Sequence, residues 1–269
     1  LRPDQAGLGS ALVRKYLSDP ESLNSFFSIS PLNPDWTRLI ETKGQHFSDS
    51  MRQKLVQALQ AQYGDLADKA TLAQIKSLAS PNTFSLTTGH QLSFGTGPLF
   101  FIYKLVSVVR LAAMLKEKYN EYHFVPIYWM NTEDHDLEEI RPLHLAGKTF
   151  TMPHEDLGQA TGLYGTRELE SVWKELESLL PKFPEFHKGI EEIKHCYQRS
   201  STLAEAIRRL VVSWTKGSGL LVLDQNDAQL KAAFAPIALQ DIVSEQSGSL
   251  VAETTEKLEH MGFKGQVMP

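Results

Sequence analysis

Hydrophobic and polar positions form their clearest series between residues 84 and 139. The short apolar run 84–87 is bounded by turn residues, and the continuous apolar run 124–130 is typical of a central parallel strand. Residues 99–117 between them are apolar on most sides, which predicts a helix packed between layers. A strand, a crossover helix and a second strand of these lengths predict a right-handed βαβ unit.

The segments on the N-terminal side of this unit are predicted to be helical for the most part. Apolar residues at helical spacing predict helices over 3–18, 48–63 and 68–78. Residues 19–36 are rich in Pro, Ser and Asn, and we expect an irregular connection there. Gly64, directly after the second of these helices, is a typical C-terminal stop signal.

After residue 139 the pattern indicates a helical insertion between sheet strands. Residues 140–152 predict a β-hairpin around a turn that contains Gly147. The short apolar segment 219–224 predicts a return to the sheet, so the chain as a whole is expected to be an α/β protein. Helices are predicted on both sides of this strand, over 168–180, 184–199, 202–216, 227–245 and 249–261.

Composition narrows the class of protein. The 269 residues suggest one large domain or two smaller ones, and 42% hydrophobic with 22% charged residues is typical of a soluble globular protein. A net charge of −5 argues against a general nucleic-acid surface, and the absence of any run of about 18 apolar residues argues against a membrane span. The one cysteine, Cys196, excludes an internal disulfide and fits a reducing cytoplasm. Because the chain starts at Leu1 and stops at Pro269 without a closing helix, we expect a fragment of a longer protein.

Polar residues collect where the first strand ends, which is where open parallel sheets bind ligands. The strand runs into Thr88-Gly89-His90-Gln91 and then into the turn Gly95-Thr96-Gly97-Pro98. Backbone N–H groups and the helix dipole at such a turn favour an anion. Lys104, in the first two turns of the helix, either reaches such an anion or extends along the helix surface into solvent. The spacing is neither that of a Walker A loop nor that of the GxGxxG fingerprint. The alternative is a glycine turn that only the backbone geometry requires.

The second strand runs into an acidic cluster, Glu133-Asp134-His135-Asp136. Carboxylates and an imidazole in a loop are able to bind a divalent cation, hold an amine or transfer protons. The alternative is a solvated turn in which a carboxylate caps the following helix. No Cys/His spacing typical of zinc is present, and which metal, if any, is used stays open.

The two clusters together resemble those of a known family. The stretches TTGHQLSFGTGPLFFIYK and YWMNTEDHDLEE resemble the bacillithiol biosynthesis cysteine-adding enzymes, and GLLVLDQNDAQLKAAFAPI resembles their third strand and following helix. The matching positions are Thr88, Gly89, Gln91, Thr96, Gly97 and Pro98 in the first motif, and Trp129, Glu133, Asp134, His135, Asp136 and Glu139 in the second. His90 departs from the glutamine of the family, and it either mimics the histidine of class I nucleotidyl-transfer loops or reflects a different substrate preference.

The resemblance implies a Rossmann-like parallel-sheet core interrupted by insertions, and a helical coiled coil that forms a homodimer. Family members are longer, so this chain corresponds to their N-terminal portion. We therefore expect four parts: 1–145, the first part of the core; 146–217, the inserted hairpin and helices; 218–246, the return to the core; and 247–269, the start of the coiled-coil region.

The resemblance also implies an activity. The reaction would join L-cysteine to the amine of glucosaminyl malate, as the last step of bacillithiol biosynthesis in the cytoplasm. Because amide formation ordinarily needs an activated carboxyl, ATP or another adenine nucleotide is the expected cosubstrate. We expect small-molecule substrates and a homodimeric partner, and neither nucleic acid nor a membrane.

The implied roles divide the two clusters. The first would bind a nucleotide phosphate or the malate carboxylates, and the second would bind an amine and transfer protons. The residues expected to act in catalysis are Asp134, His135, Asp136 and His90. The residues expected to bind substrate or anion are Thr88, Gly89, Gln91, Thr96, Gly97, Lys104 and Glu133.

Two other functions stay open. One is a nucleotidyltransferase-like activator of another small carboxylic acid, which predicts pyrophosphate exchange that depends on that acid rather than on cysteine. The other is a non-catalytic dimerisation or binding module, which predicts that Gly89 and Gly97 tolerate small side chains without loss of function, provided that folding survives.

Overall fold

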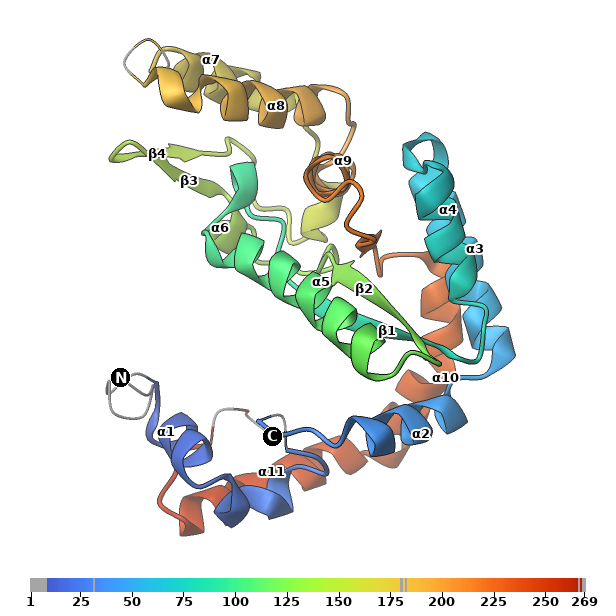
Figure 1. Ribbon diagram of the computed structural model, residues 1–269. Helices are drawn as coiled ribbons and strands as arrows, with labels where there is room; N and C mark the ends of the chain where they lie inside the picture. Colours follow the sequence, from blue (N-terminus) through green and yellow to red (C-terminus); the bar gives the residue numbers. More distant parts are fainter. Residues whose placement is uncertain (1–8, 31, 180, 182, 266, 268–269) are drawn as a thin grey trace. The chain divides into compact units, whose positions relative to one another are not determined.

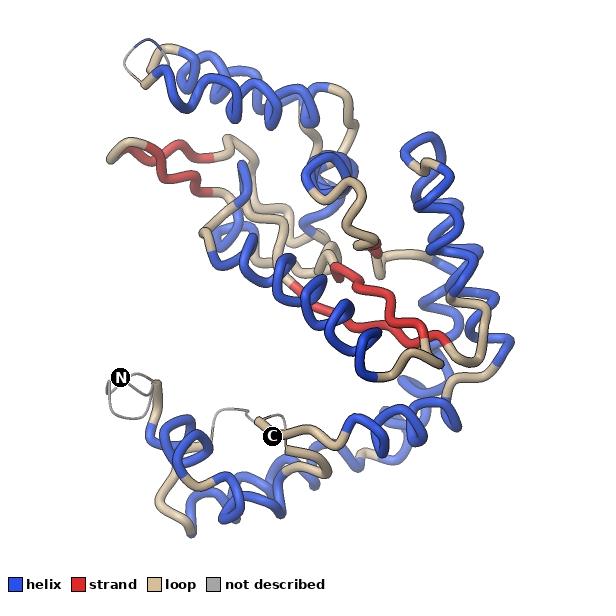
Figure 2. The backbone as a smooth tube through the Cα atoms, viewed as in Figure 1, coloured by secondary structure: helices blue, strands red, loops and turns tan. Residues whose placement is uncertain are grey.

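The computed structural model divides into two compact units (Figures 1 and 2). One is Ser48–Lys231, and the other is Leu1–Phe47 together with Ala232–Pro269. The structure describes residues 9–30, 32–179, 181, 183–265 and 267. Within these residues, no helix is both long enough and apolar enough to cross a membrane. The domain boundaries expected at residues 145, 217 and 246 stay predictions.

A three-stranded parallel sheet belongs to the unit Ser48–Lys231 (Figure 1). Its strands, in spatial order, are β1 (Thr83–Gly89), β2 (His123–Trp129) and β5 (Leu221–Leu223). Gly89 pairs with Trp129, and Trp129 pairs with Leu223, so the three strands end level with one another. The three predicted strands and the α/β class are therefore confirmed, and their carboxyl ends share one edge of the sheet.

Helix α5 (Phe100–Lys118) connects β1 to β2 and packs against both strands (Figure 1). Its buried side chains recur at helical spacing and are Phe101, Leu105, Val108, Ala112 and Leu115. Tyr103 and Met114 on other faces of the helix are exposed. The predicted strand–helix–strand unit is confirmed, whereas the expected packing of α5 between two layers is not seen among the described residues.

Three further helices lie at the β5 end of the sheet, opposite β1. Helix α3 (Asp49–Tyr63) packs against α4 (Lys69–Ser77), and both α4 and α9 (Leu203–Trp214) pack against β5. The Ser48 side chain caps the start of α3 by accepting a first-turn N–H. Gly64 ends α3 with a positive φ of 45°, a conformation that suits glycine. These helices confirm the predictions for the two segments before β1.

A buried arginine closes the turn between α4 and β1. Arg52 on α3 is 1% exposed. Its guanidinium donates hydrogen bonds to the carbonyls of Leu78, Pro81 and Thr83, at 3.2, 3.3 and 2.8 Å. Carbonyl acceptors offset the cost of burying a charged group. Strand β1 therefore begins at a fixed position beside α3.

The segment between β2 and β5 is the predicted helical insertion. Its elements are α6 (Leu137–Ile140), the antiparallel hairpin of β3 (Pro142–Leu145) and β4 (Lys148–Thr151), α7 (Glu170–Glu177) and α8 (His187–Gln198), followed by α9. A β-bridge joins Gly165 to Thr202, and the Leu203 N–H donates to the Tyr164 carbonyl at 2.9 Å. The predicted hairpin and helices are confirmed, with helix ends shifted by a few residues.

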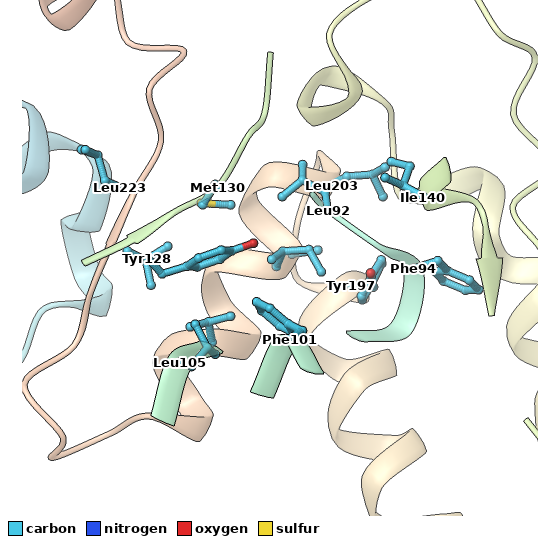
Figure 3. Packing of buried hydrophobic residues seen from close by; sticks show 14 of the residues in the cluster. Leu92, Phe94, Phe101, Leu105, Tyr128, Met130, Ile140, Tyr197, Leu203 and Leu223 are labelled. Atoms are coloured by element: carbon cyan, nitrogen blue, oxygen red, sulfur yellow. The ribbon is translucent and has the colours of Figure 1, made fainter. Parts of the chain in front are cut away.

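One hydrophobic cluster joins the sheet, α5 and the insertion (Figure 3). Tyr128 of β2 lies beside Phe101 of α5, with ring centroids 5.3 Å apart. Phe94, which follows β1, lies beside Tyr197 of α8 with ring centroids 5.7 Å apart. Because the sheet and the insertion share buried side chains, a change in one alters the packing of the other.

The second unit is helical over most of the residues that the structure describes there. Its elements are α1 (Ala11–Ser18), the 3-10 helix η1 (Pro20–Phe26), α2 (Trp36–His46), α10 (Ala228–Ser244, which starts in the other unit) and α11 (Gln246–His260). The first predicted helix is seen from Ala11 onward, and its residues before 9 lie outside the described ones. The irregular connection expected over 19–36 contains η1, and α2 was not predicted.

The last two helices have no buried residue. Helix α10 exposes Phe234, Ile237, Ile242 and Val243, each more than half accessible. An apolar helix without a buried residue is expected to pack against another surface. The coiled coil expected from residue 247 onward stays a prediction.

Candidate functional site

The carboxyl edge of the sheet brings three polar segments together. Residues 90–97 follow β1, residues 130–136 follow β2 and residues 224–227 follow β5. We call residues 89–97 the glycine loop and residues 133–136 the acidic strand end. Since the three strands end level, all three segments start from one edge.

Gln91 joins the two clusters that the sequence singled out. Its side-chain amide lies 3.3 Å from Asp134 Oδ2 and 3.3 Å from Glu139 Oε2, and it donates to both. Asp134 belongs to the acidic strand end, and Glu139 lies one turn further on in α6. One amide group therefore holds two carboxylates near each other, at the edge where the sequence predicts the site.

The two carboxylates have different surroundings. The Asp134 side chain is 31% exposed, and its Oδ1 accepts the Asp136 N–H at 3.4 Å. Glu139 is exposed, and among the described residues its side chain accepts a hydrogen bond from Gln91 alone. Two carboxylates that share one neutral donor keep acceptor capacity for a cation, and an ammonium group satisfies it with its three N–H donors.

His135 and Asp136 differ from each other in role. The His135 side chain is 83% exposed, with Nδ1 3.9 Å from Asp134 Oδ1. Asp136 Oδ1 accepts the Glu139 N–H at 3.1 Å and so caps helix α6. The alternative of a carboxylate that caps the next helix thus describes Asp136, whereas His135 faces solvent beside the shared carboxylates.

Glu133 points to a different partner. Its Oε1 lies 2.5 Å from Lys231 Nζ, and both side chains are about half exposed, at 40% and 51%. Lys231 also donates to Asn226 Oδ1 at 2.7 Å. The pair connects the segments after β2 and β5 on the solvent side of the site, where exposed ion pairs contribute little to stability.

His90 is buried at the start of the glycine loop. Its ring stacks on Phe101 with centroids 5.0 Å apart and meets Phe100 edge-on at 5.1 Å. Burial, with a smaller contribution from the Lys104 charge, lowers the pKa of His90 from 6.5 to about 4. His90 Nε2 is buried and makes no hydrogen bond among the described residues. The ring is therefore uncharged at neutral pH.

Lys104 contacts the last residue of β1. Its ammonium donates to the Gly89 carbonyl at 3.0 Å and lies 5.3 Å from the centroid of the Phe100 ring. These two contacts hold the ammonium group beside the loop. Its expected role as an anion ligand stays a prediction.

Backbone geometry requires two of the loop glycines. Gly95 and Gly97 have φ values of 74° and 66°. A Cβ on Gly97 would lie 2.5 Å from Ser93 Cβ, and one on Gly95 would lie 2.9 Å from Leu143 Cδ1. A Cβ on Gly89 would meet nothing closer than 3.7 Å, so that position has room for a methyl group. The alternative of a turn required by geometry accounts for Gly95 and Gly97.

Two threonines of the first motif precede α5 in the chain. Thr88 is the penultimate residue of β1 and is half-buried, and the Thr96 hydroxyl lies 3.5 Å from the Gly97 carbonyl. At the start of α5, Leu99 provides no side-chain cap. The N–H groups in the first turn of α5 therefore receive no acceptor from the Leu99 side chain, and an anion is a suitable acceptor for such groups.

Residues that the sequence did not single out complete the edge. Asp224, directly after β5, accepts a short hydrogen bond from Thr132. Its backbone N–H donates to Gln62 Oε1 at 2.9 Å, and its Oδ2 lies 3.6 Å from the guanidinium of Arg208. The apolar run that ends in Asp224 is a signal available in the sequence. Gln62 and Arg208 come from α3 and α9, and only the fold brings them there.

The insertion contributes a close backbone contact. The Thr161 N–H donates to the Asp134 carbonyl at 2.7 Å, and the Gly162 N–H donates to the Thr132 carbonyl at 2.9 Å. A Cβ on Gly162 would lie 2.7 Å from Thr132 Cβ. The segment before α7 therefore fixes the backbone of the acidic strand end.

No group of three or more His, Cys, Asp or Glu side chains is arranged to hold a metal ion among the residues that the structure describes. The carboxylates of the edge are instead distributed between Gln91, Lys231 and Thr132. The arrangement is suited to an organic cation held by carboxylates, with uncapped helix N–H groups nearby in the same loop.

Comparison with known proteins identifies the family. The family model "Bacillithiol biosynthesis BshC, N-terminal Rossmann-like domain" matches residues 3–269. A relative named "Putative cysteine ligase BshC" from Christiangramia forsetii is 36% identical over 264 residues, which cover 96% of this chain and 49% of the relative. Its namesake from Flavobacterium johnsoniae is 35% identical over 265 residues, covering 98% and 50%. The chain spans about half the length of these relatives.

The match extends beyond the three stretches on which the resemblance rested. It includes the segments before β1 and the helices after β5, so the family relationship covers both compact units. The parallel sheet with helices agrees with the Rossmann-like class in the description of the model. The chain belongs to the bacillithiol biosynthesis BshC family and matches the model of its N-terminal Rossmann-like domain.

Proposed function

We propose that this chain supplies the amine-binding site of a ligase that adds L-cysteine to the amine of glucosaminyl malate. The proposal rests on one observation, the convergence of Asp134 and Glu139 on the Gln91 amide at the carboxyl edge of the sheet. Two relatives of this half-length chain are named "Putative cysteine ligase BshC", which supports the same reaction class.

The chemistry of amide formation explains the carboxylates. An amine arrives at neutral pH as an ammonium ion, and it must lose a proton before its lone pair attacks the carboxyl carbon of cysteine. Asp134, with Glu139 beside it, binds the ammonium and then accepts the proton. His135, exposed next to Asp134, passes the proton to solvent. Asp136 acts by capping α6, which holds Glu139 in place.

The other half of the reaction needs an activated carboxyl group, for which ATP or another adenine nucleotide is the proposed cosubstrate. The uncapped start of α5, with Lys104 near it, is the proposed site for an anion, either a phosphate or the malate carboxylates. His90 Nε2 is buried and its ring stacks on Phe101, whereas Asp134 lies at the sheet edge, so Asp134 is the proposed base. In this proposal His90 supports the loop by packing on Phe101.

Dimerisation is proposed from a separate observation. The exposed apolar side chains of α10, including Ile242 and Val243, form a surface that a second copy would cover. Sedimentation equilibrium of the chain tests this surface, because a dimer that Val243→Glu converts to a monomer supports it. A monomeric parent chain contradicts it.

The ligase proposal is tested in a chimera in which this chain replaces the matching half of the Christiangramia forsetii relative. Mass spectrometry follows the cysteine amide of glucosaminyl malate, with and without ATP. Product that requires cysteine and ATP supports the proposal. Pyrophosphate exchange that depends on another carboxylic acid, with no cysteine product, would favour the nucleotidyltransferase-like alternative instead.

A further inference from the structure

The helical insertion holds the middle of the glycine loop. The Phe94 ring is fully buried. It lies 5.2 Å from the Trp173 ring of α7 and 5.7 Å from the Tyr197 ring of α8, and Figure 3 shows Phe94 and Tyr197 side by side. Trp173 and Tyr197 also contact each other edge-on at 5.3 Å. The loop that follows β1 is thus part of an aromatic cluster whose other members belong to the insertion.

Tyr197 adds a directional contact to this packing. Its phenol oxygen accepts a hydrogen bond from the Gly95 N–H at 3.3 Å. Tyr197 is 0% exposed, and burial raises the pKa of its hydroxyl well above the ordinary range, so the phenol stays protonated. A buried backbone N–H that loses its acceptor is costly, because no solvent replaces the bond.

Gly95 cannot shift easily to find another acceptor. Its φ of 74° is a conformation that side chains rarely adopt, and its α-carbon lies close against Leu143 of the hairpin. The Tyr197 hydroxyl therefore meets a backbone segment that is fixed from two sides by the insertion, by α8 and by β3.

Gln91 lies between two anchors of the loop. On one side, the His90 N–H donates to the Trp129 carbonyl at 3.3 Å, which continues the sheet. On the other side, four residues further on, Gly95 donates to Tyr197. The short segment between these points sets the direction of the Gln91 side chain, whose amide contacts Asp134 and Glu139.

We propose that Tyr197 is a positioning residue for the amine site, acting through Gly95 on Gln91 and hence on the two carboxylates. The inference rests on the proposed function, and it assigns to the insertion a role in ligand binding at the sheet edge. Among the described residues, Tyr197 contacts Gly95, Phe94 and Trp173 and neither carboxylate, so its effect is indirect.

The test compares Tyr197→Phe with Tyr63→Phe in the whole chain. Tyr63 is also buried, and its hydroxyl accepts the Val222 N–H at 2.7 Å, so both changes remove one buried phenol oxygen from one backbone N–H. Calorimetric titration with glucosaminyl malate measures binding at the amine site. We expect Tyr197→Phe to weaken binding by about fivefold, and Tyr63→Phe by less than about twofold.

A second readout is independent of any ligand. In the NMR spectrum, the Gln91 side-chain amide protons and the exchange rate of the Gly95 N–H report the loop directly. Tyr197→Phe should move the Gln91 resonances toward those of a free amide and speed exchange at Gly95 by about tenfold. Tyr63→Phe should leave both unchanged.

The two readouts separate the two ideas. Unchanged Gln91 resonances in Tyr197→Phe, or a loss of binding no larger than that of Tyr63→Phe, would overturn the positioning role. If the parent chain bound no glucosaminyl malate while Tyr197→Phe still released Gln91, the proposed function would fail and the positioning of Gln91 would stand. Should Tyr197→Phe fail to fold, Phe94→Leu in the same aromatic cluster provides the loop comparison.

Discussion

The glycine loop and the acidic strand end leave neighbouring strands at the same level, yet they are built in opposite ways. Phe94 in the loop is 0% exposed, whereas the His135 side chain in the strand end is 83% exposed. The loop directs part of its backbone into the protein, where the Gly95 N–H donates to the Tyr197 hydroxyl. The strand end directs Asp134 toward the sheet edge. In the proposed function, the strand end and α6 supply carboxylates that bind the amine, and the loop holds Gln91 between them.

The largest effect is expected from a substitution in the acidic strand end. Asp134→Asn keeps the size of the side chain and an oxygen that can accept from Gln91, but it removes the negative charge and the proton acceptor. In the chimera, formation of the cysteine amide should fall by at least about 100-fold. The measurement is the initial rate at saturating substrates.

Glu155→Gln is the matched control for this change, because Glu155 is an exposed carboxylate without a hydrogen bond or ion pair among the described residues. It should alter the rate by less than about twofold. A rate for Asp134→Asn within tenfold of the parent would contradict the role of Asp134 as the base.

The next largest effect is expected from a substitution in the glycine loop. Gly97→Ala combines an unfavourable φ of 66° with a contact of 2.5 Å to Ser93 Cβ, so it should lower the free energy of unfolding by about 3 kcal/mol. Gly89→Ala, where the nearest atom is 3.7 Å away, should cost less than about 1 kcal/mol. Urea unfolding of the chain measures both.

The contrast between these glycines also bears on the alternative of a simple binding module. That alternative expects both glycines to tolerate a small side chain. Equal stability of Gly97→Ala and the parent chain would show that the loop is less constrained than its geometry indicates. Because Gly89→Ala is expected to fold, its activity in the chimera is the fairer functional test.

His90, the buried histidine of the glycine loop, makes the stability of the loop side depend on pH. His90 has a pKa of about 4 in the folded chain and 6.5 as its ordinary value, so between these values the unfolded state binds the extra proton. The free energy of unfolding should therefore fall as pH is lowered from 6.5 to 4, by on the order of 2 kcal/mol from this residue.

His90→Gln, which introduces the residue expected from the family motif, should remove this part of the pH dependence. His46→Gln, at an exposed histidine on α2, should retain it. Urea unfolding at a series of pH values measures the difference. Identical pH profiles for His90→Gln and the parent would mean that His90 titrates normally.

The smallest effect is expected at the edge of the acidic strand end. Lys231→Met removes the partner of Glu133, but both side chains are about half exposed, at 51% and 40%. The free energy of unfolding should change by less than about 0.5 kcal/mol, and less still at high salt. A loss above about 1 kcal/mol in urea unfolding would show that this pair does more than an exposed ion pair.

The sequence predicted the order of elements in the unit Ser48–Lys231 well, because each strand is a short apolar run and each helix has regular spacing. It missed α2, whose only buried residue is Ile40 and whose interior contains Gly44. A helix with one buried position gives little periodic signal, and a glycine within it lowers its propensity. The cap Asp35 was a signal, obscured by the Pro-rich segment before it.

The candidate site was predictable only where its residues lie next to strand ends. Gln91 and Asp134 follow strands directly, so the rule for parallel sheets located them. Tyr197 lies 102 positions from Gly95, and Thr132 lies 92 positions from Asp224. No local pattern encodes such pairs, because the packing of the insertion on the sheet creates them.

The bridge between Gly165 and Thr202 has a consequence for how this family can vary in length. Gly165 and Thr202 lie next to each other, so the segment between them, which contains α7 and α8, is already a closed loop. Lengthening a closed loop costs little entropy, about 0.6 kcal/mol for each doubling. Natural insertions and deletions should therefore collect at the turn between α7 and α8, while the bases of both helices, which carry Trp173 and Tyr197, keep their spacing.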